Sequence, residues 1–140
     1  MSDVMFTAQA KAKGGRDGHV TSDNGVIDLN LAMPKGSEPP ADATNPEQLF
    51  AAGYAACFDG ALNLVANKAG KEIDSAINAE VSLLKDPADN GFKIGVVLHV
   101  EIDGVSQDEA EGLAGEAHKV CPYSKATSGN VNVELKIKGE

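Results

Sequence analysis

The sequence is short of positive charge. Its 140 residues include 12 Lys and Arg against 21 Asp and Glu, which gives a formal net charge of −9. A chain with this balance repels the phosphates of nucleic acids and of anionic membranes unless it has a local basic patch. The sequence has no such patch, so we do not expect it to bind nucleic acid.

The sequence also lacks the segments that export or anchor a protein. Residues 1–6 contain neither the basic start nor the apolar run of a signal peptide. No uninterrupted run approaches the ~18 apolar residues that a membrane span requires. We therefore expect a cytoplasmic protein that does not associate with membranes.

Repeats and low-complexity segments are absent as well. The 15 glycines and 6 prolines follow no period, which excludes a collagen-like chain. Hydrophobic residues make up 42% and charged residues 24% of the chain, as in an ordinary globular protein. A chain of this length buries a core without disulfides or metals, so we expect a single domain over residues 1–140.

A long helix is predicted to begin after Asn45. The proline that follows pushes Asn45 toward extended angles, which suits an N-cap, and proline fits the first helical position. Gln48 then completes the cap and Glu47 is free; with Thr44 as N-cap, Glu47 would instead form a capping box. Small and apolar residues recur at helical spacing up to a stop at Gly70, so we expect a central, buried helix.

Alternating apolar and polar residues predict the strands. The strands and helices are segregated along the chain, which indicates an α+β fold with antiparallel sheets, each covered on one face. The expected strands are residues 4–12, 26–31 (with Ile27, Leu29 and Leu31 inward), 73–83, 92–102 and 131–137.

A second helix is predicted between the last two strands. Ser106 and Glu109 have the spacing of a capping box. Pro122 disfavours continuation of the helix, so Cys121 is expected at a break.

Two cysteines, Cys57 in the long helix and Cys121 at the break, are candidates for redox chemistry. They lie 64 positions apart and form no CxxC unit. With three scattered histidines they match no zinc spacing, so we expect no metal. The residues alone leave two interpretations open: small buried hydrophobic side chains, or a reactive pair.

A reactive Cys57 would need a cation nearby. It lies about three turns inside its helix, too far from the N-terminus to gain from the dipole, and burial raises the pKa of a thiol. The only arginine is Arg16, in the glycine-rich turn at residues 14–18. A free Glu47 could hold its guanidinium by two hydrogen bonds. On local grounds, Arg16 could equally be an exposed turn residue and Glu47 part of a helix cap.

Three motifs of the sequence are specific: GGRDG at residues 14–18, TNPEQLFAAGYAACF at residues 44–58 and AHKVCPYSKAT at residues 117–127. Through them the chain strongly resembles the organic hydroperoxide resistance (Ohr) branch of the Ohr/OsmC family. The middle motif is long and specific, and the spacing agrees over nearly the whole chain. The resemblance implies an OsmC-like fold: an intertwined homodimer in which curved antiparallel sheets enclose paired central helices.

The resemblance also implies an activity, the reduction of organic (fatty-acid or alkyl) hydroperoxides to alcohols by a thiol peroxidase. Cys57 matches the peroxidatic cysteine, which becomes a sulfenic acid, and Cys121 matches the resolving cysteine, which forms a disulfide with it. Arg16 matches the arginine that stabilises the thiolate, and Glu47 the carboxylate that holds this arginine. No cofactor is implied, and the implied reductant is dihydrolipoamide or a lipoylated protein.

Two other functions remain compatible with the residues. One is a non-enzymatic carrier of hydrophobic small molecules, in which the cysteines are merely buried. The other is a redox sensor that signals through a partner. The loop at residues 35–43 is more acidic than is usual in the family, and Lys125 and Ser128 replace residues more often seen as Asn and Arg. These departures concern the loop and partner docking rather than the chemistry.

Overall fold

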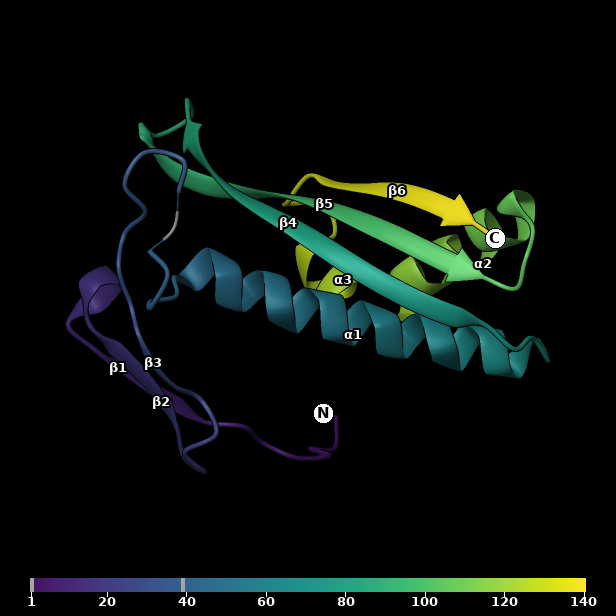
Figure 1. Cartoon of the computed structure of the whole chain (residues 1–140), viewed down its shortest axis with the longest axis horizontal. Helices are drawn as coiled ribbons and strands as arrows, with labels where there is room; N and C mark the ends of the chain where they lie inside the picture. Colours follow the sequence, from purple (N-terminus) through teal and green to yellow (C-terminus); the bar gives the residue numbers. More distant parts are fainter. Residues whose placement is uncertain (1, 39) are drawn as a thin grey trace. The chain divides into compact units, whose positions relative to one another are not determined.

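The computed structural model describes residues 2–38 and 40–140 (Figure 1). The chain forms two compact units, Met1–Leu49 and Phe50–Glu140, and each is described by itself. The single-domain organisation stays a prediction. Pro39, in the predicted acidic loop, lies outside the described residues.

The first unit is built on a three-stranded antiparallel sheet in the order β1-β2-β3. Its strands are β1 (Ala10–Lys13), β2 (His19–Ser22) and β3 (Asp28–Asn30). A single turn of 3-10 helix, η1 (Gly15–Asp17), joins β1 to β2. Gly14 and Gly15 have φ angles of 82° and 62°, a region that favours glycine, so the glycine-rich sequence is what permits this turn.

Some expectations for this unit are wrong. The first strand covers only Ala10–Lys13 instead of residues 4–12, and β2 was not expected at all. Ile27 and Leu29 are 38% and 42% exposed, and only Leu31 is buried. The reason is that the described residues of this unit contain one sheet and the first turn of a helix, too little to cover both faces of the sheet.

His19 connects β2 to β3 through its side chain. Its Nδ1 lies 2.8 Å from Asn30 Oδ1, and its Nε2 contacts the Asp28 carboxylate. The bond to Asp28, followed by that to Asn30, raises the pKa of His19 above its ordinary value. Because the folded-state pKa of His19 is raised, this contact stabilises the unit fully at pH values below the ordinary histidine pKa. The contribution is lost as the pH rises through the folded-state pKa.

We therefore expect the NMR titration midpoint of His19 to lie above that of a model peptide, and Asp28→Asn to lower it. Asp23→Asn, which removes another carboxylate of the same unit, is the matched control and should leave the midpoint in place. A midpoint that ignores Asp28→Asn would contradict the contact.

The second unit contains a mixed three-stranded sheet in the order β4-β5-β6. β4 (Asp74–Asp86) and β5 (Gly91–Asp103) form a long antiparallel hairpin, as predicted, whereas β6 (Val133–Gly139) runs parallel to β5. The expectation of antiparallel pairing throughout is therefore wrong for β6. Helices α2 (Gln107–Val120) and α3 (Pro122–Thr127) lie between β5 and β6 in the chain. A helical crossover of this kind lets the second strand run in the same direction as the first.

Helix α1 (Pro46–Lys68) begins and ends as predicted. Asn45 Oδ1 accepts a hydrogen bond of 2.7 Å from the backbone N–H of Gln48, so Asn45 is the N-cap and Glu47 is free of the cap. After the last turn Gly70 takes a φ of 70°, the left-handed conformation that commonly ends a helix.

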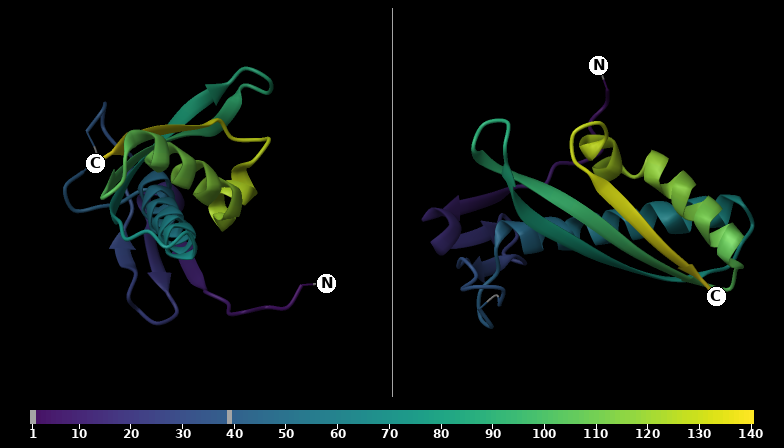
Figure 2. Two further views of the ribbon diagram at one scale, coloured as in Figure 1. Left: turned by 90° about the vertical axis from the view of Figure 1, so that its right-hand side faces the viewer. Right: turned by 90° about the horizontal axis from the view of Figure 1, so that it is seen from above.

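The core of the second unit lies between its sheet and its helices. Figure 2 shows α1 and α2 on one face of the β4-β5-β6 sheet. The capping box of Ser106 and Glu109 and the break at Cys121 are confirmed. The largest fully buried side chains come from α1, β5 and the α2–α3 break: Tyr54, Phe58, Leu62, Leu98, Val100, Ile102 and Cys121. The α+β class is thus confirmed.

Helix α1 is buried on one face only, whereas a central, buried helix was expected. Ala52, Ala56 and Gly60 form an exposed row of small side chains. By length and composition α1 is also apolar enough to cross a membrane, with a mean hydropathy of 1.4 over 18 residues, a property that it shares with the core helices of soluble proteins. Its alanines and few charges produce this value without an unbroken apolar run.

Candidate active site

The two cysteines meet in the second unit. The Sγ atoms of Cys57 and Cys121 lie 3.5 Å apart, and both are free thiols. A disulfide bond is ~2.05 Å long, so the two sulfurs need to approach by only about 1.5 Å to bond. Cys121 is fully buried and Cys57 is half-buried, which makes Cys57 the sulfur that a reagent reaches from outside.

Secondary structure places each sulfur. Cys57 lies in the middle of α1, on the turn that includes the buried residues Tyr54 and Phe58. Cys121 lies between α2 and α3 in extended conformation, because the following residue, Pro122, prevents the helical path from continuing. Its N–H still bonds the carbonyl of Ala117 at 2.8 Å, so the break is anchored to the end of α2.

The surroundings of Cys57 disfavour its thiolate. Burial raises the pKa of the Cys57 thiol above its ordinary value, and the neighbouring Cys121 adds to this. The backbone N–H of Tyr123 acts in the opposite direction, because it hydrogen-bonds the sulfur and lowers the pKa. A reactive thiolate at Cys57 therefore requires a further stabilising charge.

The first unit contains a guanidinium held in a fixed orientation. Arg16 Nη1 and Nη2 donate hydrogen bonds of 2.8 and 2.9 Å to the two carboxylate oxygens of Glu47. The bond from Arg16 lowers the pKa of Glu47, and the same bond raises the pKa of Arg16. The pairing that the residues left open is thus observed. The Arg16 side chain stays 40% exposed, with Glu47 at 16%, so the guanidinium keeps an open side.

A polar network beside the cysteines was not predicted from the sequence. Tyr54 OH and His118 Nδ1 each lie 2.8 Å from Ser124 Oγ. Thr127 Oγ1 lies 3.5 Å from Tyr54 OH and donates to the Ser124 carbonyl at 3.1 Å. The available signal was spacing: His118 and Ser124 lie three residues before and three residues after Cys121.

Three aromatic rings pack against one another on the same side of α1. Phe50, Tyr54 and Tyr123 have ring centroids 5.7–6.0 Å apart. Gly53 makes room for this packing, because a Cβ at that position would lie 2.7 Å from Tyr123 OH. The backbone N–H of Tyr123 also bonds Cys57, so this aromatic cluster is connected to the thiol.

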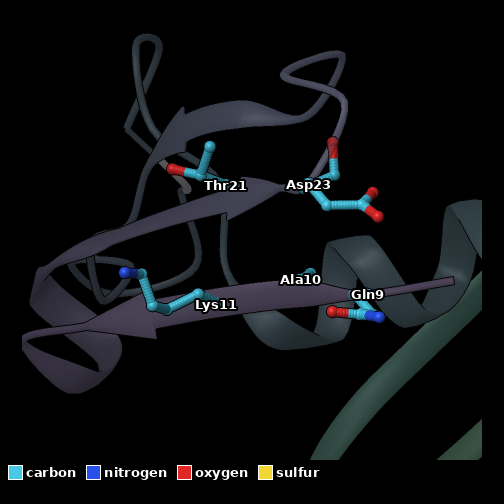
Figure 3. A pocket seen from close by; sticks show the side chains of 6 residues that line it. Gln9, Ala10, Lys11, Thr21 and Asp23 are labelled. Atoms are coloured by element: carbon cyan, nitrogen blue, oxygen red, sulfur yellow. The ribbon is translucent and has the colours of Figure 1, made fainter.

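A hollow in the first unit contains no side chain suited to redox chemistry. The first unit has a hollow of about 260 Å³ formed by β1 and β2 (Figure 3). Its lining residues are Gln9, Ala10, Lys11, Thr21, Ser22 and Asp23, none of them a cysteine or histidine. Among residues 2–38 and 40–140, no group of three or more His, Cys, Asp or Glu side chains is placed to hold a metal ion.

Comparisons with known proteins identify the relatives of this chain. The family model described as OsmC-like protein matches residues 39–136. Organic hydroperoxide resistance proteins OhrB and OhrA of Bacillus subtilis are 54% and 55% identical to it, over 96% and 98% of this chain and 99% of each relative.

Solved structures agree with the sequence comparison. The crystal structure of Bacillus subtilis OhrB matches 96% of this chain and 100% of that chain, with a TM-score of 0.91. An organic hydroperoxide resistance protein from Legionella pneumophila, 50% identical, matches 97% of this chain and 99% of that chain, with a TM-score of 0.90. These matches confirm the OsmC-like fold, and the chain belongs to the organic hydroperoxide resistance branch of the OsmC-like family.

Proposed function

We propose that this protein is a cysteine-based peroxidase that reduces organic hydroperoxides to alcohols. The observation that carries the proposal is the approach of two free thiols, Cys57 and Cys121, to 3.5 Å. The names of its relatives, organic hydroperoxide resistance proteins, supply the substrate class. Cys57 packs against the hydrophobic core of the second unit, which supports a hydrophobic hydroperoxide over hydrogen peroxide.

The reaction runs in two steps. The Cys57 thiolate attacks one oxygen of the O–O bond; that bond breaks, the alcohol leaves after taking up a proton, and Cys57 becomes a sulfenic acid. The Cys121 sulfur then attacks Cys57, forming the disulfide and releasing water. The hydroperoxide is reduced by two electrons, and the two thiols supply them.

Arg16 has the task of stabilising the Cys57 thiolate in this proposal. The thiol needs a stabilising charge because its burial raises its pKa. Arg16 is the only arginine, and the two hydrogen bonds to Glu47 fix the plane of its guanidinium. A guanidinium that binds a carboxylate along one edge still has N–H groups on its other edge, which can donate to a sulfur or to a peroxide oxygen.

A dithiol completes the cycle. The disulfide is reduced by thiol exchange, in which an external thiolate attacks the more accessible sulfur and the other sulfur leaves. Cys57 is the accessible sulfur and Cys121 is buried, so the attack falls on Cys57. We propose dihydrolipoamide or a lipoylated protein as the reductant, which becomes a cyclic disulfide, and a cytoplasmic site for the reaction.

We further propose that the active form is a homodimer. The exposed row of small side chains on α1, Ala52, Ala56 and Gly60, allows a second helix to approach closely. Leu64, on the same helix, is 51% exposed and would be covered by that contact. Light scattering should then give a particle of twice the chain mass of 14.4 kDa. A monomer at micromolar concentration would contradict this part of the proposal.

A thiol count tests the function. Fully reduced protein is mixed with one equivalent of an alkyl hydroperoxide, and a parallel sample with one equivalent of hydrogen peroxide. We expect two thiols per chain to disappear within seconds, faster with the alkyl hydroperoxide. Two unreacted thiols would favour a carrier of hydrophobic molecules. Rapid oxidation without multiple turnovers on dihydrolipoamide would favour a redox sensor.

A further inference from the structure

A largely buried polar network connects the three helices that surround the two sulfurs. Tyr54 lies on α1 three residues before Cys57, and Ser124 lies on α3 three residues after Cys121. The Tyr54 hydroxyl lies 2.8 Å from Ser124 Oγ. His118, on α2, lies 2.8 Å from the same oxygen. Ser124 therefore joins the helices on both sides of Cys121 to the helix of Cys57.

The network is buried at its centre, and its hydrogen bonds are satisfied. Tyr54 is 0% and Ser124 is 2% exposed, so water does not compete for the bond between them, whereas His118 is half-buried. With His118 accepting at Nδ1, Ser124 donates to the imidazole and accepts from Tyr54. With His118 donating at Nδ1, Ser124 accepts from it and donates to Tyr54, whose own proton then faces Thr127. The three helices thus stay connected in either protonation state of the imidazole.

Packing alone would hold the helices together without fixing their register. Apolar contacts are non-directional, whereas a hydroxyl that bonds two partners on two different helices fixes both in distance and direction. Cys121 lies between two of the anchored positions, His118 and Ser124, at the break where α2 ends and α3 begins, and its backbone bonds both helices. Its Sγ position consequently depends on how firmly the short helix α3 is held.

We propose that Tyr54, Ser124 and His118 are positioning residues that hold Cys121 Sγ against Cys57, and so set the rate of disulfide formation. This inference rests on the proposed peroxidase function. The network does not take part in the attack on the hydroperoxide. It acts on the second step, in which the Cys121 sulfur bonds the Cys57 sulfenic acid and water leaves.

The rate of disulfide formation also determines how much Cys57 is overoxidised. A sulfenic acid that waits for its partner is open to a second hydroperoxide, which oxidises it to a sulfinic acid and is itself reduced to the alcohol. A weakened network should therefore raise the fraction of overoxidised Cys57 when peroxide is in excess. Substitution of a residue with a merely structural role would lower the stability of the protein without slowing the second step more than the first.

The test separates these steps in one reaction. Reduced protein is mixed with one equivalent of an alkyl hydroperoxide; consumption of the peroxide reports the first step, and loss of the second thiol reports disulfide formation. The variants are Tyr54→Phe and Ser124→Ala, with Ser124→Thr and His118→Asn as variants that keep a bonding atom. Ser128→Ala, an exposed serine four residues further on, is the matched control. Thermal unfolding verifies that each variant is folded.

We expect Tyr54→Phe and Ser124→Ala to slow disulfide formation about 10- to 100-fold, the effect of displacing a reacting group by about 1 Å. Peroxide consumption in the first step should stay within about twofold, and excess peroxide should give more sulfinic acid. Ser124→Thr and His118→Asn should restore most of the rate, and Ser128→Ala should match the wild type. The proposal would be overturned if both Tyr54→Phe and Ser124→Ala formed the disulfide at the wild-type rate, or if Ser124→Thr were as slow as Ser124→Ala.

An equilibrium measurement keeps the inference independent of peroxidase activity. Protein is equilibrated in buffers of reduced and oxidised dithiothreitol, and the ratio of disulfide to dithiol gives the effective concentration of one thiol against the other. Tyr54→Phe and Ser124→Ala should lower it about tenfold relative to wild type and Ser128→Ala. If the wild type fails to consume hydroperoxide, the proposed function is wrong, and an unchanged equilibrium in the variants would separately overturn the positioning role.

Discussion

Serine in place of Cys57 should reduce the turnover of organic hydroperoxide by at least on the order of 10³-fold, as the loss of a nucleophile does. The substitution keeps the size of the side chain and its place on α1, but a hydroxyl does not ionise near neutral pH. No thiolate then remains to attack the O–O bond, because the buried Cys121 cannot replace it. The measurement is steady-state consumption of an alkyl hydroperoxide with dihydrolipoamide as reductant.

Cys121→Ser is the paired variant and should behave differently. It should consume one equivalent of hydroperoxide about as rapidly as the wild type and then stop, with Cys57 trapped as a sulfenic acid. The contrast follows from the two roles: one sulfur breaks the O–O bond and the other closes the disulfide. Full turnover by Cys57→Ser would remove Cys57 from the mechanism. Full turnover by Cys121→Ser with dihydrolipoamide would show that the reductant attacks the sulfenic acid directly.

The parts of the site that the sequence predicted correctly depend on local rules. Asn45 before a proline is a strong helix start, and the cap that it forms leaves Glu47 free to bind a guanidinium. Pro122 ends α2 at Cys121 because proline restricts the residue before it. Both features follow from the backbone chemistry of neighbouring residues, so no knowledge of the fold was needed to place them.

The missed parts depend on residues that are distant in the chain. Ser124 meets Tyr54, 70 positions earlier, and neither has a local pattern that indicates a partner. The direction of β6 depends on the α2–α3 crossover, which alternation of apolar residues does not report. Alternation likewise predicted buried positions for Ile27 and Leu29, because period alone does not say whether a second layer covers the face.

Lysine in place of Arg16 should slow the first step, oxidation of Cys57, on the order of 10²-fold, comparable to the loss of one preorganised donor at a developing negative charge. Lysine retains the positive charge but lacks the planar fork that binds both Glu47 oxygens at 2.8 and 2.9 Å. A lysine ammonium that binds one of these oxygens has no second set of N–H donors in a fixed orientation toward the Cys57 thiolate.

The carboxylate that holds Arg16 gives the same step an acid limit. Because the bond from Arg16 lowers the pKa of Glu47, the ion pair is intact above the ordinary glutamate pKa. Its contribution is lost only as the pH falls through the lowered, folded-state value. Glu47→Gln should remove this acid limb and slow oxidation about tenfold at neutral pH, since the amide cannot offer two acceptor oxygens.

Stopped-flow measurement of the first step from about pH 3, well below the ordinary glutamate pKa, to about pH 8 examines the substitutions at both Arg16 and Glu47. Lys13→Met is the matched control, because it removes an exposed positive charge near the same turn and leaves the fork in place. It should oxidise at the wild-type rate. If Arg16→Lys also does so, the thiolate needs only a positive charge and not an oriented guanidinium. If Lys13→Met is slowed as much as Arg16→Lys, the effect belongs to the overall field of the chain.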